Sequence, residues 1–165
     1  IDQIENPAAA AGVPPMQTPP TASPADGDSN WTSDFSAPNP EGKMVSLKQS
    51  LGKVTIVDFW ASWCGPCRAE NPHVVALYNE FHSKGLNIVG VSLDKDASKW
   101  KEAIAKDKLS WTQVSNLKHW DEPIAKQYKV EGIPATFILD ANGKVIASGL
   151  RGDELRAKIT ELLGK

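Results

Sequence analysis

Residues 54–67 read VTIVDFWASWCGPC. The first seven residues form a short apolar run rich in β-branched side chains, which is typical of a strand buried on both faces of a sheet. The stretch ends in two cysteines, Cys64 and Cys67, that are separated by two residues. The predicted strand therefore delivers a closely spaced pair of thiols to one end of a sheet.

The residues after Cys67 follow a helical period instead. Apolar side chains spaced at i, i+3, i+4 and i+7 mark one face of a helix that should end near Gly85; they are Val74, Leu77, Tyr78 and Phe81. The cysteine pair thus lies where a buried strand gives way to a helix.

The same patterns predict the remaining elements. Strands are expected at 87–93, 111–114, 135–139 and 144–148, and helices at 98–108, 121–129 and 153–163. Asn142-Gly143 is a strong signal for a two-residue hairpin turn, and the turn-rich stretch 34–50 predicts a small hairpin. Strand–helix–strand followed by a helix, a hairpin and a final helix predicts an α/β fold with a mixed sheet.

Composition excludes several classes of protein. The chain has 165 residues, a net charge of −2 and an apolar fraction of 41%. The near-balance of charge gives no electrostatic reason to expect a nucleic-acid partner. No apolar run approaches the roughly 20 residues that a membrane helix needs. Two cysteines are too few for a disulfide-stapled miniprotein or a four-cysteine zinc site.

Residues 1–30 differ from the rest of the chain. They hold six of the twelve prolines, no aromatic residue and a net charge of −4, whereas residues 31–165 carry +2 and all six tryptophans. We therefore predict a disordered Pro/Ala-rich linker over 1–30 and a single domain over 31–165. Because a linker needs something on its other side, and residue 1 is Ile, we expect an upstream domain or membrane anchor.

Two thiols at the start of a helix favour redox chemistry. Unpaired N–H groups and the helix dipole would stabilise a Cys64 thiolate, and Cys67, one turn further in, would be less exposed. Such a pair can attack a substrate disulfide and then close its own disulfide. The alternatives are a structural disulfide, whose loop is too short to stabilise much, or half of a metal site. Three histidines lack convincing ligand spacing and are expected to be surface or packing residues: His73, His82 and His119.

The motif FWASWCGPCR at 59–68 resembles the active-site segment of the thioredoxin superfamily. Together with RAENP at 68–72 and GIPAT at 132–136, it resembles the TlpA/ResA branch of bacterial envelope thiol–disulfide oxidoreductases. The resemblance covers about residues 31–165. It implies a thioredoxin fold with an N-terminal β-hairpin and a central α/β insertion at about 95–120.

The resemblance also implies a substrate-binding surface around the thiols. Ile133-Pro134 would form a cis peptide bond opposite the cysteines, and the Ile133 backbone would pair with an extended substrate; a trans turn is the alternative. Trp63 would cover the disulfide, and Gly65 and Pro66 would complete the surface.

Two carboxylates are candidate helpers of the thiols. Asp58 interrupts an apolar strand, and family members place a carboxylate there that accepts the Cys67 proton; a fraying strand end is the alternative. The lysine that partners this acid in simple thioredoxins aligns with Gly90. Glu70 would tune thiol acidity, with a first-turn glutamate favoured by the helix dipole as an equal alternative.

The other tryptophans are assigned mainly to the core. Trp60 lies in the central strand and is expected to be buried. Trp100, Trp111 and Trp120 lie in or beside the insertion, where core packing is expected and a substrate-binding patch is the alternative.

The expected function is reduction of protein disulfides in the bacterial periplasm or envelope, with Cys64 attacking and Cys67 resolving. The Gly-Pro dipeptide between the cysteines resembles the reducing members of the family. With no third cysteine, an upstream thiol reductant must re-reduce the pair. We expect a monomer without cofactor or metal. The alternatives are a non-catalytic thioredoxin-fold interaction module and, ranked lower, a peroxide reductase.

Overall fold

A computed structural model describes residues 34–164, so the predicted linker at 1–30 lies outside the described residues. The elements follow the chain in the order β2 (Ser36–Pro38), β3 (Met44–Ser46), η1 (Lys48–Ser50), β4 (Val54–Trp60), α1 (Gly65–Phe81), η2 (His82–Lys84), β5 (Leu86–Ser92), α2 (Ala97–Asp107), β6 (Thr112–Val114), η3 (His119–Asp121), α3 (Pro123–Gln127), β7 (Ala135–Leu139), β8 (Val145–Ser148) and α4 (Gly152–Leu163).

The main sheet has five strands in the order β6-β5-β4-β7-β8. β4 pairs in parallel with β5 and antiparallel with β7, which confirms the predicted mixed sheet. All seven residues of β4 are buried, as its apolar sequence predicts for a central strand. The predicted N-terminal hairpin is also present, as the separate antiparallel pair β2–β3.

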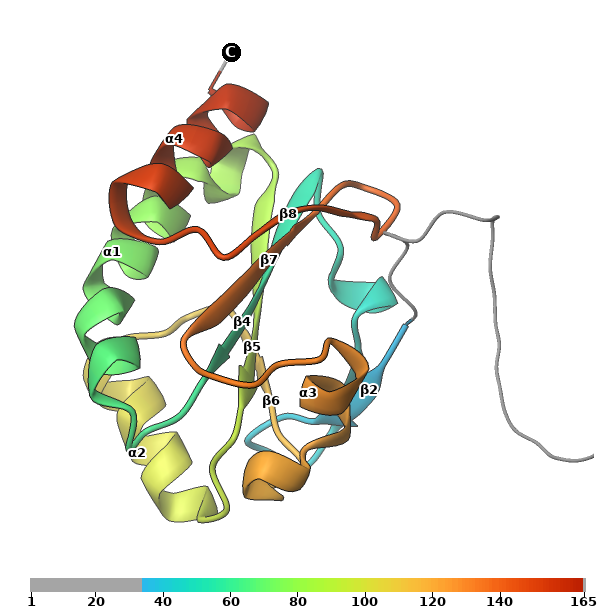
Figure 1. Cartoon of the computed structure of the whole chain (residues 1–165), viewed down its shortest axis with the longest axis vertical. Helices are drawn as coiled ribbons and strands as arrows, with labels where there is room; N and C mark the ends of the chain where they lie inside the picture. Colours follow the sequence, from blue (N-terminus) through green and yellow to red (C-terminus); the bar gives the residue numbers. More distant parts are fainter. Residues whose placement is uncertain (1–33, 165) are drawn as a thin grey trace, which may run out of the picture. The chain divides into compact units, whose positions relative to one another are not determined.

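Helices cover both faces of the sheet (Figure 1). α1 packs against α4 and α2 on one face, and α3 lies on the other. The α3 side is filled by aromatic rings, because Phe59 of β4 contacts Tyr128 and Phe137 with ring centroids 5.3 and 5.8 Å away. Residues 54, 56, 58 and 60, which alternate with Phe59, therefore face α1.

The long helix α1 begins where the sequence predicts but ends at Phe81, four residues before the predicted end near Gly85. Cys64 is its N-cap residue, with extended backbone, and Pro66 occupies the first turn. After the short turn η2, Gly85 takes the left-handed conformation at φ 113°, which a glycine adopts without steric cost. The insertion predicted at about 95–120 contributes α2 and the edge strand β6.

The helix predicted at 121–129 is shorter than expected. Asp121 belongs to η3, and the helix itself covers only Pro123–Gln127. Glu122 acts as the N-cap, because its side chain accepts a hydrogen bond from Ile124 N–H. At the other end Lys129 is left-handed, with φ 59°, which ends the helical geometry.

The turn at Asn142-Gly143 also differs from the prediction. Only Gly143 has a positive φ, of 88°, so the two residues do not form the expected two-residue turn with both residues left-handed. Instead Gly143 N–H donates to the Asp140 carbonyl, and the Asp140 carboxylate accepts from the N–H groups of Asn142 and Lys144. The aspartate side chain thus fixes a wider turn.

Within residues 34–164, no helix has the length and apolar character needed to cross a lipid bilayer.

Candidate active site

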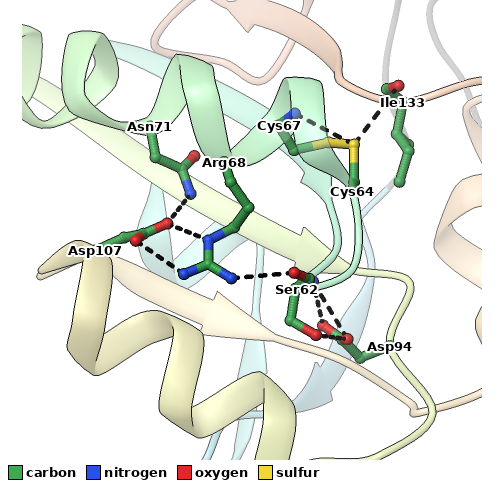
Figure 2. The surroundings of a disulfide bond; sticks show 8 residues. All are labelled: Ser62, Cys64, Cys67, Arg68, Asn71, Asp94, Asp107 and Ile133. Atoms are coloured by element: carbon green, nitrogen blue, oxygen red, sulfur yellow. Dashed lines mark hydrogen bonds and ion pairs between the residues drawn. A yellow bond between two sulfur atoms is a disulfide. The ribbon is translucent and has the colours of Figure 1, made fainter.

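The two cysteines form a disulfide at the N-terminus of α1 (Figure 2). Their Cα atoms are 5.3 Å apart, and Cys67 N–H points at Cys64 Sγ over 3.2 Å. Cys64 is 5% exposed and Cys67 1% exposed, so the order of exposure is as predicted and both residues are buried. An N–H group directed at Cys64 Sγ from a helix N-terminus stabilises negative charge on that sulfur.

The loop before β7 lies against this disulfide. Figure 2 shows the Ile133 carbonyl directed toward Cys64, and its oxygen lies 3.9 Å from Cys64 Sγ. The Ile133–Pro134 peptide bond is cis, as the resemblance implies. Beside it is a hollow of about 370 Å³, which is lined by Gly132, Ile133, Pro134, Thr136, Gly149 and Arg151.

Asp58 is a buried carboxylate in the middle of the sheet. It is 6% exposed and pairs in register with Gly90 of β5 and Thr136 of β7. β4 continues for two more buried residues beyond it, so the alternative of a fraying strand end is wrong. Burial, followed by the charge of Glu70, raises the pKa of Asp58 to about 7. A carboxyl group with this pKa can take up and release a proton near neutral pH.

Glu70 lies one turn beyond Cys67 on α1. Its Oε2 accepts a 2.7 Å hydrogen bond from the N–H of Gly152, the first residue of α4. α1 begins at Gly65 and has no acidic residue in its first turn, so the alternative that Glu70 is a first-turn glutamate favoured by that helix's dipole is wrong. The carboxylate instead bonds to the N-terminus of the neighbouring helix, while its charge acts on Asp58.

Comparison with known proteins places this geometry in a family. Residues 30–148 match the AhpC/TSA family. The chain belongs to this family. Similar proteins include the thiol–disulfide oxidoreductase ResA of Bacillus thuringiensis, 30% identical over 76% of this chain and 70% of that protein. The thiol:disulfide interchange protein HelX of Rhodobacter capsulatus is 31% identical over 68% of this chain and 62% of its own length.

Solved structures give the same result. The thioredoxin domain of a thiol–disulfide oxidoreductase from Bacteroides vulgatus has a TM-score of 0.76 at 34% identity, covering 84% of this chain and 99% of that one. A thiol–disulfide oxidoreductase from Bacteroides fragilis has a TM-score of 0.74 at 34% identity, covering 81% and 99%. The thioredoxin-like fold is thereby confirmed, and the chain is a thiol–disulfide oxidoreductase of the AhpC/TSA family.

The tryptophans of this oxidoreductase divide into core and surface. Trp60, Trp100 and Trp111 are buried, as expected. Trp63, just before Cys64, is 49% exposed, and its ring centroid lies 5.2 Å from that of His119. Trp120 is 39% exposed, and its ring meets that of His119 edge to face at 6.3 Å between centroids, so core packing is wrong for Trp120.

A polar network beside the disulfide was not predicted from the sequence (Figure 2). The Asp107 carboxylate of α2 accepts from Arg68 Nε at 2.5 Å, from Arg68 Nη2 at 3.0 Å and from Asn71 Nδ2 at 2.8 Å. Arg68 Nη1 also donates to the Ser62 carbonyl at 3.0 Å. Burial would raise the pKa of Asp107, but the hydrogen bonds from Arg68 and Asn71 outweigh burial and lower it. Arg68 thus links Asp107 of the insertion to the loop that carries Trp63.

Asp94, two residues after the end of β5, holds the same loop. Its carboxylate accepts hydrogen bonds from Ser62 N–H, from Ser62 Oγ at 2.5 Å and from Ser92 Oγ at 2.6 Å.

The sequence contains only part of the signal for the Arg68 network. Arg68 and Asn71 lie three residues apart in the RAENP motif, which indicates a shared helix face. Their partner Asp107, 36 to 39 residues away, had no such signal.

Within residues 34–164, no cluster of three or more His, Cys, Asp or Glu side chains could hold a metal ion. His82, for example, stacks on Tyr78 with ring centroids 4.5 Å apart, and its Nδ1 lies 2.9 Å from the Leu86 carbonyl. It has the packing role expected from the sequence.

Proposed function

We propose that this oxidoreductase reduces disulfides in protein substrates of the bacterial envelope. The observation that supports it most directly is the placement of Cys64, at a helix N-terminus and facing the Ile133–Pro134 loop, with the titratable Asp58 buried in the adjacent strand. In this proposal the Cys64–Cys67 disulfide is the form of the enzyme that remains after it has reduced a substrate.

The proposed reaction begins with the reduced pair. The Cys64 thiolate attacks one sulfur of the substrate disulfide, the substrate S–S bond breaks, and the displaced thiolate takes a proton from solvent. Cys67 then gives its proton to Asp58, and the Cys67 thiolate attacks Cys64 in the mixed disulfide. The second substrate sulfur leaves as a thiolate and takes up the proton held by Asp58. Two electrons pass from the enzyme dithiol to the substrate.

The exposed surface around Cys64 supports a polypeptide substrate. The Ile133 backbone lies beside the sulfur that attacks, in a position to pair with an extended chain, and Trp63, next to Cys64 in the sequence, offers an exposed apolar face. Gly65 and Pro66 lie between the two cysteines, on the same surface. Gly65 has no atoms within 4 Å of where a Cβ would lie, so a substrate can approach the backbone there.

Envelope location, a tether and action as a monomer belong to the same proposal. The resemblance to envelope oxidoreductases supports the location, and the acidic, proline-rich composition of residues 1–30 supports a linker. Because the chain has only two cysteines, a separate thiol donor must return it to the dithiol form. Fractionation of cells that carry the full-length gene, with blotting for this domain, tests the location and the tether.

Insulin reduction tests the reaction itself. Wild-type protein should reduce insulin disulfides with a dithiol donor, and Cys64→Ser should abolish the activity. Cys67→Ser should accumulate a mixed disulfide on Cys64, which identifies the substrate when the trap is made in cells. Equal activity of wild type and Cys64→Ser would reject catalysis and favour an interaction module.

Equilibration with glutathione measures the reduction potential of the Cys64–Cys67 pair and so tests the direction of electron flow. A potential as high as that of strong dithiol oxidants would overturn the proposal that the protein reduces its substrates.

A further inference from the structure

Four residues form a row across the sheet beside the active site. Gln113 of β6 is the register partner of Gly90 in β5, Gly90 is the partner of Asp58 in β4, and Asp58 is the partner of Thr136 in β7. Side chains of register partners lie on the same face of a sheet, with strands about 4.8 Å apart. Gln113 and Asp58 therefore flank Gly90 on the face covered by α1.

The Gln113 side chain fills the space that Gly90 leaves open. A Cβ added to Gly90 would lie 2.3 Å from Gln113 Oε1 and 2.8 Å from Nε2. The amide group thus lies over Gly90, in the direction of Asp58. The polar group at this place thus comes from β6, the strand of the inserted segment.

The orientation of the amide follows from one hydrogen bond. Trp60 Nε1 lies 3.0 Å from Gln113 Oε1, and an indole N–H can only donate, so the oxygen of the amide must face the indole. The Nε2 end is directed away from Trp60. It is buried and has no hydrogen-bond partner among the residues that the structure describes. Buried hydrogen-bond donors are almost always paired, so the unpaired Nε2 of Gln113, a residue that is only 4% exposed, needs an explanation.

We propose that Gln113 is a positioning residue for Asp58, which stabilises the ionised carboxylate across Gly90 through the N–H end of its side-chain amide. This inference rests on the proposed function, in which Asp58 accepts the Cys67 proton. Gln113 itself neither gains nor loses a proton. It sets the balance between the neutral and ionised forms of the acceptor.

Other elements around Asp58 also affect its ionisation. Glu70 on α1 disfavours ionisation by its charge, and burial disfavours it more strongly. Thr136 on β7 directs its hydroxyl to the Leu150 carbonyl. On the β5 side Gly90 offers no side chain, so the amide of Gln113 is the polar group that β6 contributes to this row.

The test is a pH titration of Asp58 in the oxidised protein, in which ¹³C NMR of the Asp58 carboxyl carbon reports its ionisation. Gln113→Met keeps the length of the side chain and removes the amide, and it should raise the pKa of Asp58 by about 0.5 unit or more, a roughly threefold change in the ionised-to-neutral ratio. Gly90→Ala should have the same effect, because its Cβ displaces the flexible amide. The double variant should shift no further than either single one.

Val114→Ala is the packing control, since this buried neighbour lies on the opposite face of β6. It should lower stability without moving the Asp58 titration. An unchanged or lowered Asp58 pKa in both Gln113→Met and Gly90→Ala would overturn the inference, and Gly90→Ala decides alone where Gln113→Met does not fold. If Asp58→Asn leaves the release of substrate from the mixed disulfide unaffected, the proposed role of Asp58 fails, while the titration still tests Gln113.

Discussion

The Glu70 carboxylate on α1 accepts a 2.7 Å hydrogen bond from the N–H of Gly152, the first residue of α4. The N-cap position of α4 is Arg151, whose side chain makes no capping hydrogen bond. Glu70 therefore satisfies a donor that the α4 sequence leaves unpaired, and it brings negative charge to the positive end of that helix. The same charge disfavours ionisation of Asp58, so one side chain affects both helix packing and the buried acid.

Glu70→Gln should separate these two effects. The amide oxygen can still accept from Gly152, but the charge is gone, so the pKa of Asp58 should fall below about 7. At pH 5, where Asp58 is neutral in both proteins, the variant should lose about 0.3–1 kcal/mol of stability, as expected for a charge at a helix N-terminus. NMR titration and urea unfolding measure these changes.

Glu80→Gln is the matched control, because Glu80 is an exposed glutamate on the same helix that pairs with Arg156. It should leave the Asp58 titration unchanged. An Asp58 pKa that stays the same in Glu70→Gln would mean that the charge of Glu70 does not reach Asp58.

The elements with strong periodicity were predictable from the sequence. β4 and β7 have the predicted boundaries, because both are short apolar runs of strand length that are rich in β-branched and aromatic residues. The turn at 140–144 was not predicted correctly, because its geometry depends on the Asp140 side chain bonding to two backbone groups. Local sequence also failed for the helix at 121–129, where the Glu122 cap and left-handed Lys129 shorten it.

The candidate site divides in the same way. Cys64, Cys67 and the Ile133–Pro134 loop were predicted, since each belongs to a short motif. The partners of Glu70 and Arg68 were not, because Gly152 and Asp107 lie 82 and 39 residues away and their approach depends on how whole helices pack. Motifs reveal the reacting groups, whereas the groups that orient them depend on tertiary structure.

Asp58→Asn should change the pH dependence of stability. A carboxyl pKa raised from 3.8 to about 7 means that the folded state holds a proton which the unfolded state has released, so wild-type stability falls as pH rises through this range. The difference of about 3 units corresponds to at most about 4 kcal/mol. The variant should match wild type near pH 4 and be more stable above pH 7.

Urea unfolding at several pH values between 4 and 8 measures the effect. In parallel, resolution of the mixed disulfide should slow by about 100-fold, the lower end of what general-base catalysis provides. Parallel stability curves for the two proteins over this pH range would contradict the raised pKa of Asp58.

Asp107→Asn should weaken the link between α2 and the active-site loop. The carboxylate accepts three hydrogen bonds from Arg68 and Asn71, and both partners of the ion pair are partly buried, so the loss should be about 2 kcal/mol at pH 7. Because the folded-state pKa of Asp107 is lowered, its stabilising effect is present above its ordinary value of 3.8 and is lost as pH falls through the lowered pKa. The difference from wild type should therefore vanish in acid.

Asp121→Asn provides the control, since its ion pair with Lys126 is 3.5 Å long and solvent-exposed. It should cause no measurable change in stability. If the two variants behaved alike in chemical unfolding, the network around Arg68 would not contribute to the fold.

His119 should matter for substrate binding through Trp63. The imidazole packs 5.2 Å from the exposed indole, on a backbone held at φ 54°. His119→Gly removes the ring but suits the left-handed backbone, so it should keep near-wild-type stability, whereas His119→Ala should be about 1 kcal/mol less stable than His119→Gly.

The same two variants should weaken substrate binding. In both of them Trp63 loses a neighbour, so its side chain must be ordered when substrate binds, which costs about 0.5–1.5 kcal/mol. KM for insulin should therefore rise about 2- to 12-fold with kcat unchanged. His73→Ala, at an exposed position elsewhere on α1, should change neither constant. A fall in kcat at constant KM would instead mean that His119 acts on the reaction at Cys64 rather than on the orientation of Trp63.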